Sequence, residues 1–217
     1  MHLTFRLVEL LGKAEAGTAT DNELQLIRVL TPIAKLFTAR QAMEVVSEAL
    51  EAHGGAGYIE DTGIPQLLRD TQVLTIWEGT TNVLALDLLR AVGSGPASVL
   101  AEEIERNVAL ADRPELRGPA DVAGSSFRAA ERWRKQAMAE GDEAALEAGA
   151  RRYAMEVART LEVALTAAHA RWSAEAERDL RASIVASRLA WRLGAFECPD
   201  RPEPTRALAL DRPLPSS

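Results

Sequence analysis

Apolar residues recur at three- and four-residue spacing along most of the chain, a pattern typical of helices with one buried face. The first predicted helix covers residues 3–15. Thr20 and Glu23 have the spacing of a capping box and predict the start of a second helix. Pro32 either begins a fresh helix there or kinks one long helix. That segment should end at the glycine-rich residues 54–57, because glycine easily adopts left-handed backbone.

The pattern then becomes less regular before further helices follow. Residues 58–65 are predicted as a loop, and a short helix over 66–69 leads into a turn at Glu78. Another helix is expected over 82–92, followed by a linker candidate at 93–96. Beyond the linker, four more helices are expected at about 97–111, 119–140, 142–172 and 174–194.

The longest of these helices carries a regular apolar stripe, which indicates a core position. Its members are Leu146, Ala150, Tyr153, Val157, Leu161, Leu165, Ala168 and Trp172. No segment has the alternation of a strand. The predicted fold is therefore all-α: an up-and-down helical bundle over 1–93, a helical extension over 97–195, and a proline-rich irregular tail over 196–217.

Composition narrows the possible partners. The net charge of -7 argues against a general polyanion binder. One basic cluster consists of Arg128, Arg132, Arg134 and Lys135, but nearby acids favour a solvated face over a nucleic-acid site. No apolar run is long enough to cross a bilayer, so no membrane partner is expected.

The cysteine and the histidines indicate neither a disulfide framework nor a metal site. The single cysteine, Cys198, excludes an internal disulfide and suits a reducing compartment, so a cytoplasmic location is expected. His2, His53 and His169 do not have zinc-site spacing to Cys198, and no metal is predicted.

Glu78 is the sharpest candidate for chemistry. A carboxylate beside Ile76 and Trp77 is expected to be poorly solvated, which suits a base working near neutral pH. Gly79 permits close approach of a ligand, and the polar residues 80–82 stand at a predicted helix start, where free N–H groups can bind phosphate or carboxylate. Spacing alone nevertheless favours the alternative that Glu78 is an ordinary first-turn acid stabilised by the helix dipole.

A second candidate is the run from Gly54 to Tyr58. It could bind phosphate, but it lacks the order G-x-G-x-x-G and follows a helix rather than a strand. A helix C-cap followed by a turn is the more economical interpretation, and both roles can coexist. His53 lies in the last helical turn, where a cation would favour the helix dipole.

Taken together, three segments resemble the C-terminal helical domain of acyl-CoA dehydrogenases. Residues 34–37 read A-K-L-F, and residues 51–58 read E-A-H-G-G-A-G-Y, similar to the family's flavin-contact motif Q-x-x-G-G-x-G-[YF]. Residues 68–70 and 76–82, L-R-D and I-W-E-G-T-T-N, resemble its R-D…[YW]-E-G-[TS] motif. Their order and separations fit together over residues 1–93. The segment 97–195 resembles, less specifically, the extension of longer members, the alkylation-response-like flavoproteins.

This resemblance implies FAD-dependent α,β-dehydrogenation of an acyl-CoA thioester. Glu78 would take the α-proton while the β-hydrogen leaves as hydride to the flavin, and Gly79 would lie near the thioester carbonyl. The residues expected to contact FAD are Thr80 and Asn82 and, across a subunit boundary, His53, Gly54 and Gly55. The family's glutamine is replaced by Glu51, which weakens any polar contact assigned to that side chain.

The family's N-terminal helical and middle β domains supply most of the flavin and acyl-CoA pocket and are not found in this sequence. The chain alone is therefore expected to bind FAD weakly or not at all and to be inactive. It should act as a homo-oligomer or in a complex with a chain carrying those domains. The alternatives are a non-catalytic helical oligomerisation module or a nucleic-acid-associated flavoprotein fragment, and the latter requires a basic surface over 97–195 that the sequence lacks.

Overall fold

The computed structural model describes residues 1–193, 210 and 212, and their regular structure is helical without a β-strand. The predicted all-α class is confirmed. Most of the predicted tail, including Cys198, lies outside the described residues. The helices are α1 (His2–Glu15), α2 (Asp21–Ala52), α3 (Ile64–Leu74), α4 (Thr81–Gly93), α5 (Ala97–Leu110), α6 (Arg117–Ala139), α7 (Glu143–Trp172) and α8 (Arg181–Ala190). Short 3-10 turns cover Gly54–Gly57, Glu60–Thr62, Pro114–Leu116 and Trp191–Leu193, and a π turn covers Ser173–Glu177.

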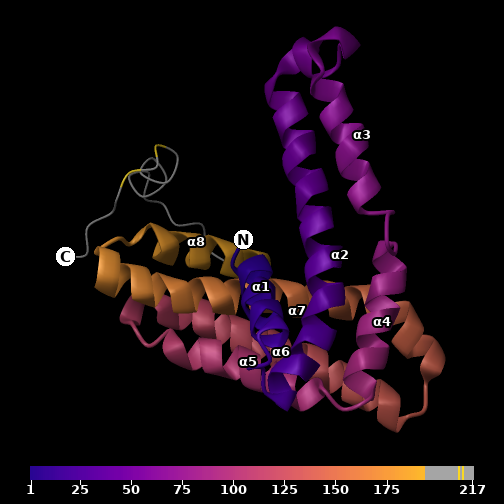
Figure 1. Ribbon diagram of the computed structural model, residues 1–217, viewed down its shortest axis with the longest axis vertical. Helices are drawn as coiled ribbons and strands as arrows, with labels where there is room; N and C mark the ends of the chain where they lie inside the picture. The colour runs from indigo at the N-terminus through magenta and orange to yellow at the C-terminus, as the bar shows by residue number, and fades with distance from the viewer. Residues whose placement is uncertain (194–209, 211, 213–217) are drawn as a thin grey trace.

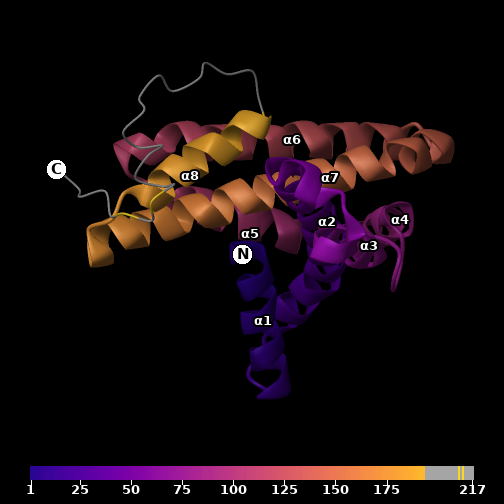
Figure 2. The same ribbon diagram turned by 90° about the horizontal axis from the view of Figure 1, so that it is seen from above.

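Helix α7 is the central element of the body of the molecule. Helices α5, α6 and α8 pack along it, and α1, α2 and α4 contact it as well (Figures 1 and 2). Helix α2 leaves this body and continues upward with α3 beside it (Figure 1). The two form a projecting hairpin, whose far end is the 3-10 turn at Gly54–Gly57.

The main apolar core joins both sides of the linker at residues 93–96. It contains buried residues of α2 and α4, such as Ile33 and Leu88, together with Leu100 of α5 and Leu161 of α7. The stripe predicted on α7 is buried at Ala150, Tyr153, Val157, Leu161 and Leu165. Leu146 and Ala168 are half-buried, whereas Trp172 is exposed.

Burial divides α2 into two halves. From Leu26 to Ala39 most side chains are buried, whereas the apolar face predicted to continue through Met43 and Leu50 is only half-buried. The first half lies in the body and the second half belongs to the projecting hairpin (Figure 1). The hairpin thus has little core of its own within the part of the chain that the structure describes.

The start of α2 follows the prediction. Thr20 Oγ1 accepts from the Glu23 backbone N–H, and the Glu23 carboxylate accepts from the Thr20 N–H, which completes the capping box. Pro32 lies inside a single continuous helix, so no fresh helix begins there. Lys13 of α1 donates to Glu23 at 2.6 Å and lowers the pKa of that carboxyl to about 2.

Two predicted helices differ in extent. The short helix expected over 66–69 is the eleven-residue α3, Ile64–Leu74. Gly63 adopts left-handed backbone before it, and Pro65 stands in its first turn, where a missing N–H carries no penalty. The helix expected over 174–194 is interrupted by the π turn and by Arg178 at φ +55°, and the helix α8 begins only at Arg181.

No single helix among the described residues is long and apolar enough to cross a membrane. Helices α4 and α5 taken together satisfy length and composition, but they are bent by 98° at their junction. Both contribute buried residues to the main core, including Leu88, Val99 and Ile104.

Candidate active-site turn

The Glu78 turn, residues 75–80, connects α3 to α4 with unusual backbone geometry. Glu78 has φ +53° and Gly79 has φ +112°. Helix α4 begins at Thr81 with Thr80 as N-cap, so Glu78 precedes the cap by two residues. The interpretation of Glu78 as a first-turn helix acid is therefore wrong, because no acidic residue lies in that first turn.

The left-handed conformation of Glu78 is costly. A residue with a Cβ pays about 1–2 kcal/mol in this region, because the Cβ approaches the following carbonyl oxygen. Arg178 is the other non-glycine residue with positive φ in the described part of the chain. Such strain persists where the surroundings enforce it, and it is concentrated at functional sites.

Lys35 of α2 is the residue that contacts this turn from the neighbouring helix. Its ammonium donates to the carbonyl oxygens of Leu74 at 2.7 Å, Trp77 at 2.5 Å and Gly79 at 3.3 Å. The Leu74 carbonyl belongs to the last turn of α3, where the helix leaves its carbonyls without helical partners. A cation there also favours the negative end of the helix dipole.

Glu78 itself is open to solvent. Its neighbours Ile76 and Trp77 are 58% and 63% exposed, and Glu78 is exposed as well. The apolar wall expected around this carboxylate is thus not formed by the described part of the chain. The Glu78 carboxylate also makes no hydrogen bond or ion pair with any residue that the structure describes. The carboxylate is thus unpartnered among the described residues, on a backbone segment that Lys35 contacts.

The start of α4 next to Glu78 is uncapped. The Thr80 side chain makes no capping hydrogen bond, although Thr80 occupies the N-cap position. The first helical bond runs from the Leu84 N–H to the Thr80 carbonyl, so the N–H groups of residues 81–83 lack acceptors within the helix. Thr80 and Asn82 are exposed. This helix start can accept an anion such as a phosphate.

The glycine turn, residues 53–57, lies at the far end of the hairpin. His53 is the C-cap of α2, and its Nδ1 donates to the Ala49 carbonyl at 2.7 Å. Gly54 has φ +55°, and a Cβ added at Gly54 or Gly55 would meet nothing within 4 Å. Gly57 is different, since its Cβ would lie 2.0 Å from the Leu50 carbonyl oxygen. The C-cap interpretation is therefore confirmed, and the backbone at Gly54 and Gly55 remains open to a ligand.

The structure brings the predicted site residues together in two groups rather than one. Glu78, Gly79, Thr80 and Asn82 lie within five positions of one another around the start of α4. His53, Gly54 and Gly55 stand at the opposite end of the hairpin (Figure 1). From the lysine beside the Glu78 turn, at position 35, α2 continues for about 27 Å to position 53 at a rise of roughly 1.5 Å per residue. Within one chain the two groups cannot touch the same part of a ligand.

Arg69, from the predicted R-D motif, has a structural role in the hairpin. Its guanidinium donates to both Glu60 oxygens, at 2.8 and 2.9 Å, and these bonds hold the pKa of the Glu60 carboxyl below its usual range. Glu60 belongs to the short 3-10 turn before α3, so the pair joins the turn to the helix. Both side chains are exposed, which makes this pair weakly stabilising.

Lys35 is the residue of this site whose role the sequence patterns did not show. It lies in a run of α2 positions that are otherwise largely buried, from Pro32 to Ala39. A single lysine among buried apolar neighbours is the signal that could have identified it, because such an amine needs partners.

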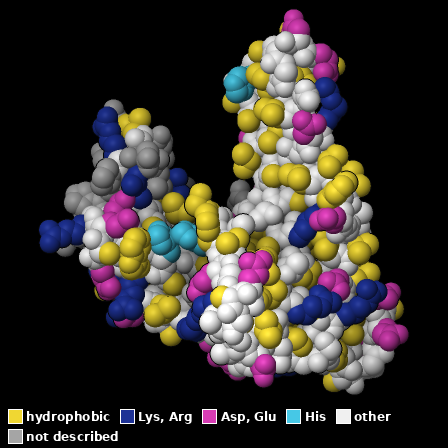
Figure 3. Space-filling model, viewed as in Figure 1, with side chains coloured by type: hydrophobic (Ala, Val, Ile, Leu, Met, Phe, Trp, Pro, Cys, Tyr) yellow, Lys and Arg dark blue, Asp and Glu magenta, His cyan; other side chains and the backbone are white. Residues whose placement is uncertain are grey.

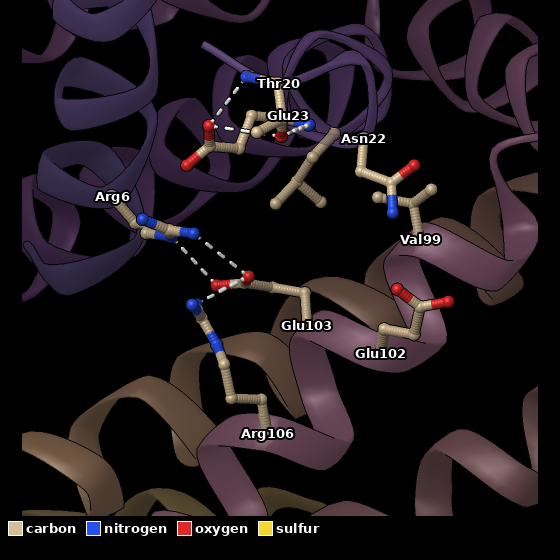
Figure 4. Close-up of a pocket in the computed structure, with 9 residues that line it drawn as sticks. Arg6, Thr20, Asn22, Glu23, Val99, Glu102, Glu103 and Arg106 are labelled. Atoms are coloured by element: carbon tan, nitrogen blue, oxygen red, sulfur yellow. Dashed lines mark hydrogen bonds and ion pairs between the residues drawn. The ribbon is translucent and has the colours of Figure 1, made fainter. Parts of the chain in front are cut away.

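The charged clusters elsewhere have structural partners. Arg6 and Arg106 converge on the buried Glu103, and these residues line a cavity of about 230 Å³ between α1, α2 and α5 (Figure 4). Arg134 was expected on a solvated face, but it is buried and donates to Glu131 at 2.9 and 2.8 Å. The described residues contain no group of three or more His, Cys, Asp or Glu side chains that could hold a metal ion.

Comparison with known proteins identifies the class of the first part of the chain. Residues 2–93 match the family model described as "Acyl-CoA dehydrogenase, C-terminal domain". These residues hold both the glycine turn and the Glu78 turn. Residues 2–93 thus match the C-terminal domain of acyl-CoA dehydrogenases, and the resemblance predicted from the sequence is confirmed.

Individual relatives agree with this class. "Acyl-CoA dehydrogenase family member 11" of Caenorhabditis elegans is 54% identical over 100 residues, which are 46% of this chain and 16% of that protein. "Putative acyl-CoA dehydrogenase AidB" of Escherichia coli K12 is 35% identical over 133 residues, 56% of this chain and 24% of that protein. The chain therefore spans about a quarter or less of the length of these relatives.

A solved structure resembles nearly the whole chain. It is the crystal structure of Caenorhabditis elegans ACDH-11 in complex with C11-CoA, with a TM-score of 0.81 and 32% sequence identity. The match covers 97% of this chain and 37% of that one. The helices after the linker therefore share the arrangement of this relative as well as those before it.

Proposed function

We propose that this chain supplies the catalytic base and part of the FAD-binding surface of an acyl-CoA dehydrogenase. Glu78 would remove the α-proton of an acyl-CoA thioester. The observation that carries the proposal is the Glu78 turn: an exposed carboxylate without a partner, on strained left-handed backbone, beside an uncapped helix start. A glutamate that served only stability would have no reason to keep this conformation.

The residues around Glu78 have the properties that proton removal needs. Gly79 places backbone without a side chain next to the carboxylate, so the thioester carbonyl can come close. The carboxylate is exposed to solvent, and a bound acyl chain together with a second protein surface would exclude water around it and around Ile76 and Trp77. Proton transfer by a positioned carboxylate is worth roughly 100- to 10,000-fold in rate.

The described residues fit FAD at its polar end. The open N–H groups at the start of α4, with exposed Thr80 and Asn82, suit an anionic group such as the pyrophosphate. The exposed backbone of Gly54 and Gly55, beside His53, offers a second place for the cofactor of another subunit. When bound, FAD supplies the acceptor for the hydride that leaves the β-carbon.

Exposed apolar side chains on the hairpin support association with further protein. Tyr58, Leu67, Val73, Ile76 and Trp77 are between 51% and 86% exposed. Figure 3 shows hydrophobic side chains spread over the projecting hairpin. We propose that this surface packs against a second copy or against protein carrying the rest of the flavin and acyl-CoA pocket, since exposed apolar area of this kind usually marks an interface.

Activity should be measured on the chain in complex with the protein that carries the flavin pocket. The assay follows dye reduction with undecanoyl-CoA and with shorter and longer saturated acyl-CoA thioesters. We expect Glu78→Gln to retain bound FAD and to lose at least 100-fold in kcat. Glu105→Gln removes another exposed glutamate, from α5, and should keep wild-type activity. Wild-type kcat in the Glu78→Gln variant with full FAD content would remove Glu78 from the role of base.

A further inference from the structure

We propose that Lys35 is the positioning residue for Glu78: its ammonium holds the strained turn that presents the carboxylate. The inference rests on the proposed function for its catalytic part, but its structural part stands independently. Lys35 belongs to α2 and lies 43 positions before Glu78 in the sequence. The contact is therefore a long-range tertiary interaction and does not follow from the local conformational preferences of the turn.

The three donors of the Lys35 ammonium are directed at the segment on both sides of Glu78. They reach the carbonyls of Leu74, Trp77 and Gly79. A lysine ammonium has three N–H donors, so this set can use them all. Lys35 makes no ion pair with a carboxylate within the described part of the chain. Its hydrogen-bond acceptors are thus backbone carbonyl oxygens.

The geometry of these acceptors explains why Glu78 remains in the left-handed region. The Trp77 carbonyl belongs to the peptide unit that enters Glu78, and the Gly79 carbonyl lies just beyond the second residue with positive φ. Both point at one ammonium, which fixes the orientation of the backbone before and after the strained residue. Hydrogen bonds to a charged donor are stronger than neutral ones, so they can offset a backbone penalty.

The same lysine fixes the turn relative to α3. The Leu74 carbonyl is in the last turn of α3, and the N–H groups of Ile76 and Trp77 donate back to the Val73 carbonyl at 3.0 and 2.8 Å. The end of α3, the Glu78 turn and the middle of α2 are therefore one connected unit. Removal of the ammonium leaves the carbonyls near Glu78 without their shared donor, and the carboxylate should then sample several positions.

Hydrogen–deuterium exchange on the 217-residue chain tests whether Lys35 holds the Glu78 turn. We expect Lys35→Met to speed exchange at the amides of Ile76 and Trp77 at least tenfold, with little change in α6 and α7. Lys135→Met is the matched control, because Lys135 is an exposed lysine on α6. Lys35→Arg keeps a charged donor and should recover much of the protection. Wild-type exchange at both amides in Lys35→Met overturns the proposal.

Kinetics of the flavin-containing complex test the catalytic part. Lys35→Met should lower kcat 10- to 100-fold, leave KM for acyl-CoA within threefold, and be partly rescued by Lys35→Arg. A purely structural role would instead lower the amount of folded complex and leave the kcat of the remainder unchanged. If Lys35→Met keeps the wild-type kcat while Glu78→Gln is inactive, Lys35 has no positioning role and Glu78 remains the proposed base. If Lys35→Met accelerates exchange but Glu78→Gln is fully active, Glu78 is not the base, whereas the structural role of Lys35 is supported.

Discussion

The left-handed backbone at Glu78 predicts that stability and activity move in opposite directions. Glu78 has φ +53°, a conformation that costs a residue with a Cβ about 1–2 kcal/mol. Asparagine adopts it more readily, because its short side chain can hydrogen-bond to nearby backbone. The Glu78 side chain is exposed, so its replacement removes little packing. We expect Glu78→Asn to raise the free energy of unfolding by about 0.5–1 kcal/mol, roughly half of that penalty.

Two variants separate relief of strain from general effects. Glu78→Gln keeps the shape and the penalty of the side chain, so its stability should stay within about 0.5 kcal/mol of wild type. Glu105→Asn in the exposed face of α5 should lower stability by about 0.5 kcal/mol, because asparagine is a poorer helix former than glutamate. For a chain of 217 residues a change of 1 kcal/mol corresponds to about 2–4 °C in Tm.

Urea unfolding followed by far-ultraviolet circular dichroism measures these differences. Equal stability of Glu78→Asn and Glu78→Gln would refute the inference that the turn stores strain. A stabilised Glu78→Asn variant that keeps full acyl-CoA-dependent activity in the complex would show that the strain has nothing to do with catalysis. The expected pair of results, a more stable and inactive protein, is the trade-off typical of residues kept for function.

The further predictions concern glycines in α7 and α1 and the charged pair on α6. Gly149→Ala should lower Tm although alanine favours helices, because its Cβ would lie 2.1 Å from the Trp133 ring. Gly12→Ala, with nothing within 4 Å, should instead stabilise by about 0.5–1 kcal/mol in the same calorimetric comparison. Glu131→Gln should cost about 3 kcal/mol in urea unfolding, because it leaves the buried Arg134 without its carboxylate. Burial favours the neutral form of Glu131, but hydrogen bonds from its partners hold its pKa below the ordinary 4.5. Its contribution is therefore complete above pH 4.5 and lost as pH falls through the lowered value, so acid unfolding should be shallower in Glu131→Gln.

Much of the fold follows from local patterns. The capping box at Thr20 and Glu23 marks the start of α2, and the stripe through Tyr153 and Leu161 marks the buried face of α7. These features depend on residues three or four positions apart, so the sequence alone displays them. The prediction placed the start of α3 too late, because Gly63 and Pro65 were assigned to a loop, whereas Gly63 is the N-cap of the helix and Pro65 lies in its first turn.

The geometry of the candidate site was less accessible to prediction. Glutamate disfavours positive φ, so nothing in the sequence around position 78 indicates the left-handed turn. The contact that holds it comes from Lys35, on another helix, and short-range patterns do not show such pairs. The expected apolar wall around Glu78 is not observed for a related reason: Ile76 and Trp77 are apolar, but none of the described residues covers them.

The length of the hairpin has a consequence for genetics as well as for chemistry. In the proposed assembly, the glycine turn of one chain and the Glu78 turn of another serve one site, so each chain contributes to two sites. Assemblies made only of chains with a defective Gly54, or only of chains carrying Glu78→Gln, would then be inactive. Mixed together, they would form hybrid assemblies in which one site collects both defects and another has none. Recovery of activity on mixing would show that α2 extends far enough for its glycine turn to reach the site of the neighbouring subunit.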